Sequence, residues 1–136
     1  MANDDEIRKI LTSVKTIALV GFSANPARPS HGVAAFLQRK GFRVIPVNPG
    51  LAGQTQLGET VYATLKEIPL PIDMVDVFRA SEHVAAVMEE AIAIKAKVVW
   101  TQLDVVDEAA AGKGRAAGLQ VVMNRCPAIE MPRLGL

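Results

Sequence analysis

A short apolar run that passes into a loop rich in Gly and Pro constrains the fold of this chain most. Thr16–Val20 reads as a buried strand, and the polar loop after it extends to Ser30, where an amphipathic segment begins. Backbone N–H groups and the helix dipole converge at the start of such a helix, where they favour an anion. The sequence therefore predicts a phosphate site in this loop, although Ser30 alone would also serve as an ordinary N-cap.

Apolar runs alternate with amphipathic segments along the rest of the chain. Predicted helices cover residues 3–14, 30–40, 81–94 and 104–117. Predicted strands are Thr16–Val20, Phe42–Val47, Ile72–Phe78, Lys97–Thr101 and Leu119–Met123. Strands that alternate with helices are typical of a doubly wound, mainly parallel sheet with helices on both faces. We therefore expect an α/β fold and a single domain over residues 1–136.

Several local features are predicted from residue type. Ser81 and Asp104 are the expected N-caps of the third and fourth helices. Residues 50–60 have the composition of a loop, and Val61–Glu67 reads as a strand fragment followed by a short helical turn. The tail Asn124–Leu136 contains prolines and is expected to be irregular and packed rather than helical.

The composition disfavours several classes of protein. A net charge of +1 without a block of like charge argues against nucleic-acid binding. No apolar run approaches the roughly 20 residues that span a bilayer, and the acidic N-terminus does not resemble a signal peptide. A single cysteine, Cys126, fits the reducing cytoplasm, and two histidines with one cysteine are too few for a structural zinc site.

The carboxyl ends of the predicted strands indicate where a ligand binds. In a doubly wound sheet the ligand lies beyond these ends, so four segments are candidates: Gly21–Ser30, Val47–Gly50, Phe78–Ser81 and Thr101–Asp104. The dinucleotide fingerprint is absent because Ser23 stands at its second glycine position. The second strand also ends without the acidic residue that holds ribose hydroxyls, which disfavours NAD.

The residues show no catalytic constellation. His31 follows the loop without an evident partner, so we expect it to form hydrogen bonds there rather than to catalyse. Cys126 lies near the sheet edge, but a lone cysteine without a flanking base is mainly structural. Arg79 has two open roles, which are contact with a ligand phosphate and an ion pair with Glu82.

Six segments taken together resemble the small stand-alone CoA-binding proteins, which are similar in fold to the CoA-binding domain of the succinyl-CoA synthetase α subunit. The resemblance extends from about Ile7 to Glu130. The segments are Val20–His31, Val44–Pro49, Gly58–Tyr62, Ile72–Arg79, Val99–Leu103 and Val121–Glu130.

The resemblance implies a Rossmann-like fold with coenzyme A at the strand carboxyl ends. On the matching positions, it implies that the phosphates are surrounded by Gly21, Phe22, Ser23, Asn25, Arg28 and Ser30. It implies that the adenosine part is flanked by Val47, Asn48 and Pro49. It implies that the path of the pantetheine is bordered by Phe78, Arg79, Trp100 and Gln102.

This chain departs from the family pattern at two positions. Asn124 replaces the usual Asp, and Asp104 replaces the usual Gly, which adds a carboxylate near the strand edge. The second domain of the synthetase subunit, with its phosphorylated histidine, is not expected here, so synthetase activity does not follow.

Our leading hypothesis is a cytoplasmic, non-catalytic protein that binds coenzyme A or an acyl-CoA, and neither nucleic acid nor membrane. One alternative is an enzyme on acyl-CoA or another nucleotide, with His31 or Cys126 taking part. Another is a subunit that lends CoA to a partner enzyme chain.

Overall fold

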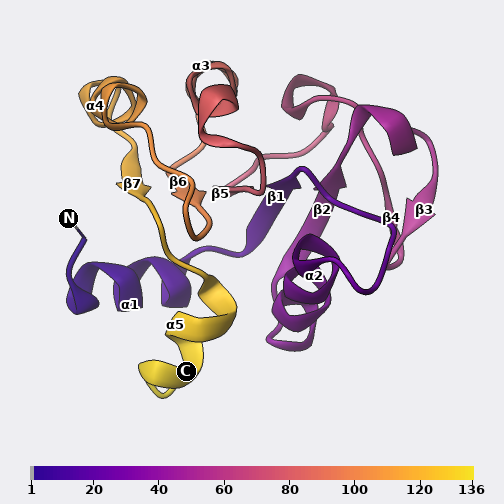
Figure 1. Cartoon of the computed structure of the whole chain (residues 1–136), viewed down its shortest axis with the longest axis horizontal. Coiled ribbons are helices and arrows are strands. Elements are labelled where there is room, and N and C mark those ends of the chain that lie inside the picture. Colours follow the sequence, from indigo (N-terminus) through magenta and orange to yellow (C-terminus); the bar gives the residue numbers. More distant parts are fainter. Residues whose placement is uncertain (1) are drawn as a thin grey trace.

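A five-stranded parallel sheet forms the centre of the molecule in the computed structural model, which describes residues 2–136 (Figure 1). Its strands are β1 (Thr16–Val20), β2 (Arg43–Val47), β5 (Met74–Val77), β6 (Val98–Thr101) and β7 (Gln120–Val122). Their order is β2-β1-β5-β6-β7, and each neighbouring pair is parallel. The winding direction reverses between β1 and β5, which confirms the expected doubly wound α/β fold.

Helices cover both faces of the sheet (Figure 1). On one face lie α1 (Asp4–Ser13), α2 (Pro29–Arg39) and α5 (Pro127–Arg133), and on the other lie α3 (Val84–Ala93) and α4 (Glu108–Ala116). Each face of the sheet has its own apolar core. Side chains alternate along β1, so Leu19 packs in the core under α1, α2 and α5, and Ala18 packs in the core under α3 and α4. Because both faces are covered, the strands are apolar almost throughout. None of the helices described here combines the length and apolar character needed to cross a membrane.

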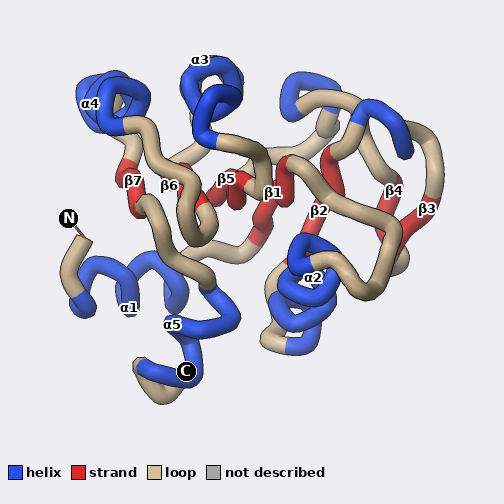
Figure 2. The backbone as a smooth tube through the Cα atoms, viewed as in Figure 1, coloured by secondary structure: helices blue, strands red, loops and turns tan. Residues whose placement is uncertain are grey.

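The connection from β2 to β5 contains more structure than its composition predicts. The expectation of a plain loop over residues 50–60 is wrong, because β3 (Thr55–Gln56) and β4 (Glu59–Thr60) form a short antiparallel ribbon beyond β2 (Figure 2). Leu57 and Gly58 at its turn both have positive φ, as a tight hairpin requires. The strand fragment and helical turn predicted for Val61–Glu67 are confirmed by a bridge at Tyr62 and a 3-10 turn over Leu65–Glu67.

Both predicted N-caps are wrong. Ser81 begins a 3-10 turn (Ser81–His83), and its Oγ accepts a hydrogen bond from Val106 N at 2.9 Å, which joins the loops after β5 and β6. Helix α4 is capped by Asp107, whose carboxylate accepts from Ala110 N at 3.0 Å. Asp104 instead has φ 66°, a left-handed conformation that favours the glycine usual in the family.

The tail is helical over Pro127–Arg133, so the expectation of an irregular segment is also wrong. Pro127 occupies the first turn, where its fixed φ suits a helix start and no N–H is needed. Arg133 then donates to Asp4 of α1 at 2.8 Å and to buried Glu130 at 3.1 Å. These ion pairs and the burial of Met131 stabilise a helix that local sequence does not indicate.

Gly21 allows β1 to end in close contact with the neighbouring strand. Its φ is 89°, and a Cβ built on it would lie 2.5 Å from Phe78 O. Only glycine combines this backbone conformation with so close an approach. Gly32 in α2 is different, because a Cβ there meets nothing within 4 Å.

We expect Gly21→Ala to lower the free energy of unfolding by more than ~2 kcal/mol, because the methyl group adds a clash to an unfavourable φ. The matched control, Gly32→Ala, is expected to raise it by up to ~1 kcal/mol, since alanine is the better helix former. Urea unfolding followed by circular dichroism measures both values. Equal stability of Gly21→Ala and the parent chain would contradict the close contact.

Candidate functional site

The loop after β1 is held by hydrogen bonds to β2 and α2. Gly21 N and Phe22 N both donate to Val47 O, at 3.0 and 3.3 Å. Ser23 N donates to Ser30 Oγ at 3.0 Å. Ser30 therefore ties the loop to the first turn of α2, while the N-cap position itself is taken by Arg28.

Short polar side chains shape the middle of this loop. Asn25 N donates to Ser23 Oγ at 3.2 Å, and Ala27 N donates to Asn25 Oδ1 at 3.0 Å. Within residues 2–136, the N–H groups of Ala24 and Ser30 have no acceptor. These two donors, the start of α2 and the exposed Arg28 make the loop suited to an anion.

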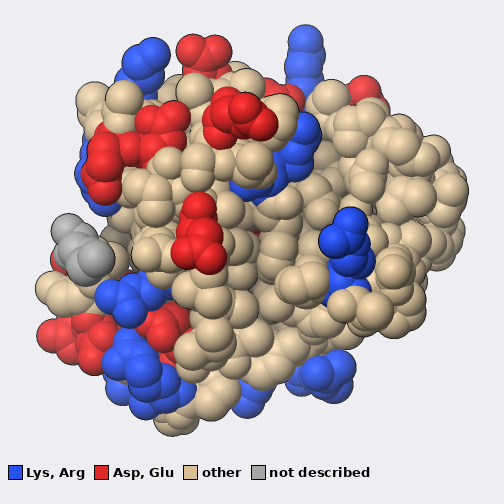
Figure 3. Space-filling view, in the orientation of Figure 1, with Lys and Arg blue, Asp and Glu red and all other residues tan. Residues whose placement is uncertain are grey.

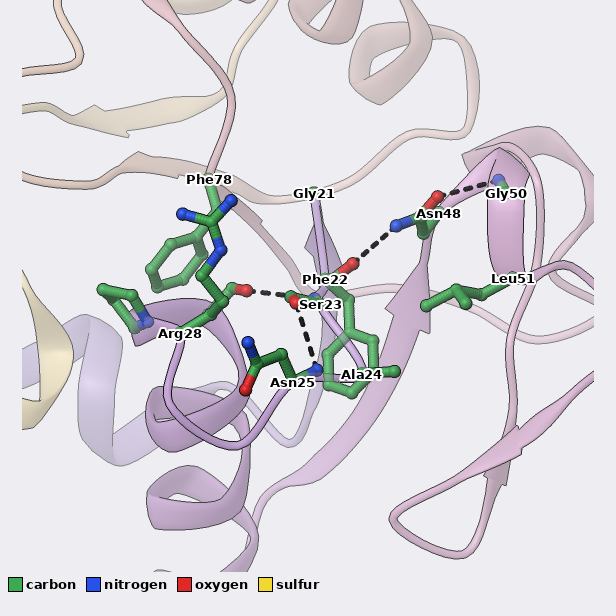
Figure 4. A pocket seen from close by; sticks show the side chains of 12 residues that line it. Gly21, Phe22, Ser23, Ala24, Asn25, Arg28, Asn48, Gly50, Leu51 and Phe78 are labelled. Carbon is green, nitrogen blue, oxygen red and sulfur yellow. Dashed lines mark hydrogen bonds between the residues drawn. The ribbon is translucent and has the colours of Figure 1, made fainter.

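A cavity of about 640 Å³ opens over this loop, and we name it the loop cavity (Figure 4). In Figure 4, Arg28 and Phe78 lie on one side of it and Asn48, Gly50 and Leu51 on the other. Its full lining is Gly21, Phe22, Ser23, Ala24, Asn25, Arg28, Pro29, Ser30, Asn48, Gly50, Leu51 and Phe78. The residues that the resemblance assigns to the phosphates are therefore brought together.

A second cavity of about 450 Å³, the β2 cavity, continues from the first past Gly21, Asn48 and Gly50. It contains the residues expected beside the adenosine, Val47, Asn48 and Pro49, together with Arg79. Asn48 is itself a structural link, because its Nδ2 donates to Phe22 O at 2.7 Å and its Oδ1 accepts from Gly50 N at 2.8 Å.

A third cavity of about 370 Å³, the Cys126 cavity, lies beyond Phe78. Its lining is Pro29, Val33, Phe78, Arg79, Ala80, Gln102, Leu103, Val105 and Cys126. Three of the residues expected along the pantetheine path, Phe78, Arg79 and Gln102, meet here. The β2, loop and Cys126 cavities thus follow one another along the carboxyl edge of the sheet, with the loop cavity in the middle.

Three of the predicted site residues, Trp100, Phe22 and Val47, have side chains in the core. Trp100 is fully buried and lines none of the three cavities. Its ring packs in the core on the face of the sheet that α1, α2 and α5 cover, and its Nε1 donates to Arg125 O at 2.8 Å. The ring of Phe22 is also fully buried and packs against His31 at a centroid distance of 5.5 Å. Phe22 therefore offers the loop its backbone.

The candidate catalytic residues lack activating partners. In the described part of the chain, the side chain of His31 makes no hydrogen bond and packs on Phe22 instead. Burial, with the nearby carboxyls of Asp76 and Glu130, raises the pKa of the Cys126 thiol, although two backbone N–H groups oppose this. A raised pKa disfavours the nucleophilic thiolate.

Arg79 is not held by the ion pair considered above. Glu82 lies 3.8 Å from His83, and no acidic side chain in residues 2–136 pairs with Arg79. Its guanidinium therefore remains available to a ligand.

Asp76 is a buried acid to which the sequence interpretation gave no role. It is fully buried in β5, between Leu19 and Trp100 on the neighbouring strands. Its Oδ1 accepts from Gln102 Nε2 at 2.7 Å, while its Oδ2 has no hydrogen-bond partner in the described chain. Burial raises the pKa of Asp76 to about 7, and the hydrogen bond from Gln102 opposes that rise. An acidic residue within an otherwise apolar strand is the sequence feature that could have indicated this buried group.

Charges of both signs are mixed on the face of the molecule that Figure 3 shows, and no basic stripe crosses it. Within residues 2–136, no three His, Cys, Asp or Glu side chains gather closely enough to hold a metal ion.

The buried carboxyl of Asp76 makes stability depend on pH. Its pKa is about 7 in the fold and near 3.8 in the unfolded chain. The folded state therefore loses stability as pH rises through the folded pKa, by up to ~1.4 kcal/mol per pH unit. We expect the stability of Asp76→Asn relative to the parent chain to rise between about pH 5 and pH 8.

Urea unfolding at several pH values measures this difference. Asp73→Asn is the control. Burial alone would raise the pKa of the Asp73 carboxyl, but hydrogen bonds from Lys15 N and Thr16 N hold that pKa below 3.8. The stability of Asp73→Asn relative to the parent chain is expected to stay constant over the same pH range. A level difference for Asp76→Asn as well would contradict the raised pKa.

The chain is similar to proteins from bacteria and archaea. A Bacillus subtilis protein named YneT, described as uncharacterized, is 42% identical over 121 residues, which is 89% of this chain and 88% of that protein. A solved hypothetical protein from Pyrococcus horikoshii OT3 is 39% identical with a TM-score of 0.93, over 99% of this chain and 94% of that chain. A solved Thermus thermophilus protein is 36% identical with a TM-score of 0.93, over 98% and 99%.

A more distant likeness concerns the fold alone. A dinucleotide-forming acetyl-coenzyme A synthetase 1 from Ca. Korarchaeum cryptofilum is 19% identical with a TM-score of 0.66, over 79% of this chain and 25% of that chain. The family model described as the CoA binding domain matches residues 15–132. Because this match covers most of the chain, including all five strands of the sheet, the protein belongs to the CoA-binding domain family.

Proposed function

We propose that this protein binds coenzyme A along the carboxyl edge of its sheet and does not itself transform it. The observation that carries the proposal is the loop after β1. In a chain of the CoA-binding family, this loop presents the free N–H groups of Ala24 and Ser30 and the guanidinium of Arg28 to one cavity. Such donors at a helix start are suited to a diphosphate.

The succession of cavities supports a direction for the ligand. The diphosphate lies in the loop cavity, and the adenosine part enters the β2 cavity beside Val47, Asn48 and Pro49. Arg79 lines both the β2 cavity and the Cys126 cavity and is placed to contact a phosphate. The pantetheine arm passes Phe78 toward Gln102.

Two features favour binding without catalysis. The raised pKa keeps the Cys126 thiol protonated, and the ring of His31 packs against Phe22 without a hydrogen bond to a base. General acid–base or nucleophilic catalysis needs such a partner within hydrogen-bond reach. The proposed role is therefore to hold coenzyme A or an acyl-CoA.

An alternative is an enzyme, or an enzyme subunit, that acts on acyl-CoA. The observation in its favour is that the thiol of Cys126 lines the cavity at the pantetheine end. Turnover of acyl-CoA that disappears in Cys126→Ser or His31→Ala while binding persists would support this alternative. Co-purification of a separate enzyme chain would support the subunit.

We expect coenzyme A to bind more tightly than NAD in isothermal titration calorimetry of the purified protein. Arg28→Ala and Arg79→Ala are each expected to weaken CoA by ~1–3 kcal/mol, or about 5- to 150-fold, because each loses a charged hydrogen bond. Arg39→Ala is the matched control, since Arg39 is exposed at the far end of α2 and lines none of the three cavities.

Two results would count against the proposal. Tighter binding of NAD than of CoA, or binding of neither, would contradict coenzyme A as the ligand. Unchanged affinity in both arginine variants, with the fold intact, would contradict the placement of the phosphates.

A further inference from the structure

We propose that the Cys126 cavity is an acyl site, which selects CoA thioesters with a short, uncharged acyl group over free CoA and over thioesters with a terminal carboxylate. This inference rests on the proposed binding of coenzyme A. It adds the chemical class of the group carried at the thiol end.

The Cys126 cavity is continuous with the loop cavity. Pro29 and Phe78 line both, so the two are neighbours across these side chains. A ligand whose diphosphate lies on the loop has its far end directed past Phe78 into the Cys126 cavity. At about 370 Å³ the space falls in the range of small-molecule sites, roughly 300–1,000 Å³.

The wall of the Cys126 cavity is mostly apolar. Val33, Leu103 and Val105 line the cavity, with Ala80 and Phe78. Leu103 is 51% exposed, whereas the other leucines of residues 2–136 are buried or half-buried. An acyl chain that covers this surface gains about 25 cal/mol for each Å² of apolar area removed from water.

A hydrogen-bonded polar pair, Gln102 and Asp76, lies at the base of the cavity. Gln102 is only 6% exposed, and its Nε2 donates to Asp76 Oδ1 at 2.7 Å. This bond holds the amide, while Gln102 Oε1 has no donor within residues 2–136. The free oxygen can accept a hydrogen bond from an amide N–H of the pantetheine arm.

The same pair disfavours an acidic acyl group. A terminal carboxylate would be desolvated among apolar side chains and would lie near the acid Asp76. Arg79 is the cation that lines the cavity, and the proposed complex already engages it with a phosphate. A neutral hydrocarbon end meets none of these costs.

The test compares CoA, acetyl-CoA, butyryl-CoA and succinyl-CoA by calorimetry with the intact protein. Each buried methylene is expected to tighten binding about fourfold, which corresponds to ~0.8 kcal/mol. Butyryl-CoA should therefore bind up to about fifteenfold more tightly than acetyl-CoA. Succinyl-CoA, with the same number of acyl carbons as butyryl-CoA and a terminal carboxylate, should bind more weakly than butyryl-CoA.

Two variants with matched exposure localise the effect. Leu103→Ala removes part of the wall and is expected to reduce the preference for butyryl-CoA over CoA at least threefold. Ile129→Ala is the control, because Ile129 is 53% exposed, against 51% for Leu103, and does not line the cavity. This control should leave the preference unchanged.

Cys126 supplies an independent readout, because it is the only cysteine of the chain. Butyryl-CoA should slow the reaction of Cys126 with methyl methanethiosulfonate more than desulfo-CoA, which lacks the sulfur and the acyl group. Equal affinities for CoA, butyryl-CoA and succinyl-CoA with equal labelling of Cys126, or tighter binding of succinyl-CoA, would overturn the acyl site and leave coenzyme A binding intact. Failure of every CoA compound to bind would instead overturn the proposed function.

Discussion

The contact between the end of β1 and the strands on either side of it supports the rest of the site. Gly21 N and Phe22 N donate to Val47 O of β2, while the Cα of Gly21 lies against Phe78 O, just after β5. This contact lies where the winding of the sheet reverses, so the loops after β1 and β5 diverge from it. The loop cavity opens between these diverging loops, and the β2 and Cys126 cavities adjoin it.

The candidate site has two parts, which are the hydrogen-bonded loop after β1 and the buried pair of Asp76 and Gln102. The side-chain oxygens of Ser23, Asn25 and Ser30 accept hydrogen bonds from backbone N–H groups and so hold the loop after β1 in shape before any ligand arrives. Such preorganisation lowers the entropy that a ligand must otherwise overcome. On the other side of Phe78, the hydrogen-bonded pair of Asp76 and Gln102 lies at the base of the Cys126 cavity, whose walls are mostly apolar. The two halves suit the two ends of one long ligand, an anion at one end and an uncharged group at the other.

Sequence patterns predict the sheet and the course of the chain after β1 well, because both depend on local chemistry. Each strand is an apolar run, and Gly21 follows the first of them at a position that only glycine can occupy. Helix α5 was not predicted, because its prolines argue against a helix, while the salt bridge from Arg133 to Asp4 depends on a residue at the far end of the chain. The ribbon of β3 and β4 was likewise hidden in a polar segment.

The candidate site was predictable only in part for the same reason. Motif resemblance pointed to Trp100, whose place in the core follows from the register of β6 against β5. The role of Asp76 was missed because its partner Gln102 lies on another strand end, and only the fold brings them to 2.7 Å. Residue type predicts Ser81 as a helix N-cap, but its hydroxyl joins two loops that are distant in sequence. Long-range partners therefore account for most of what the residues alone did not reveal.

The most direct test of coenzyme A binding at the β1 loop is amide NMR of the labelled protein during titration with CoA. We expect the N–H signals of Ala24 and Ser30, which have no acceptor in the described chain, to shift downfield and exchange more slowly with solvent as phosphate oxygens accept from them. If CoA binds while these two signals stay in place and signals elsewhere move, the central claim is contradicted.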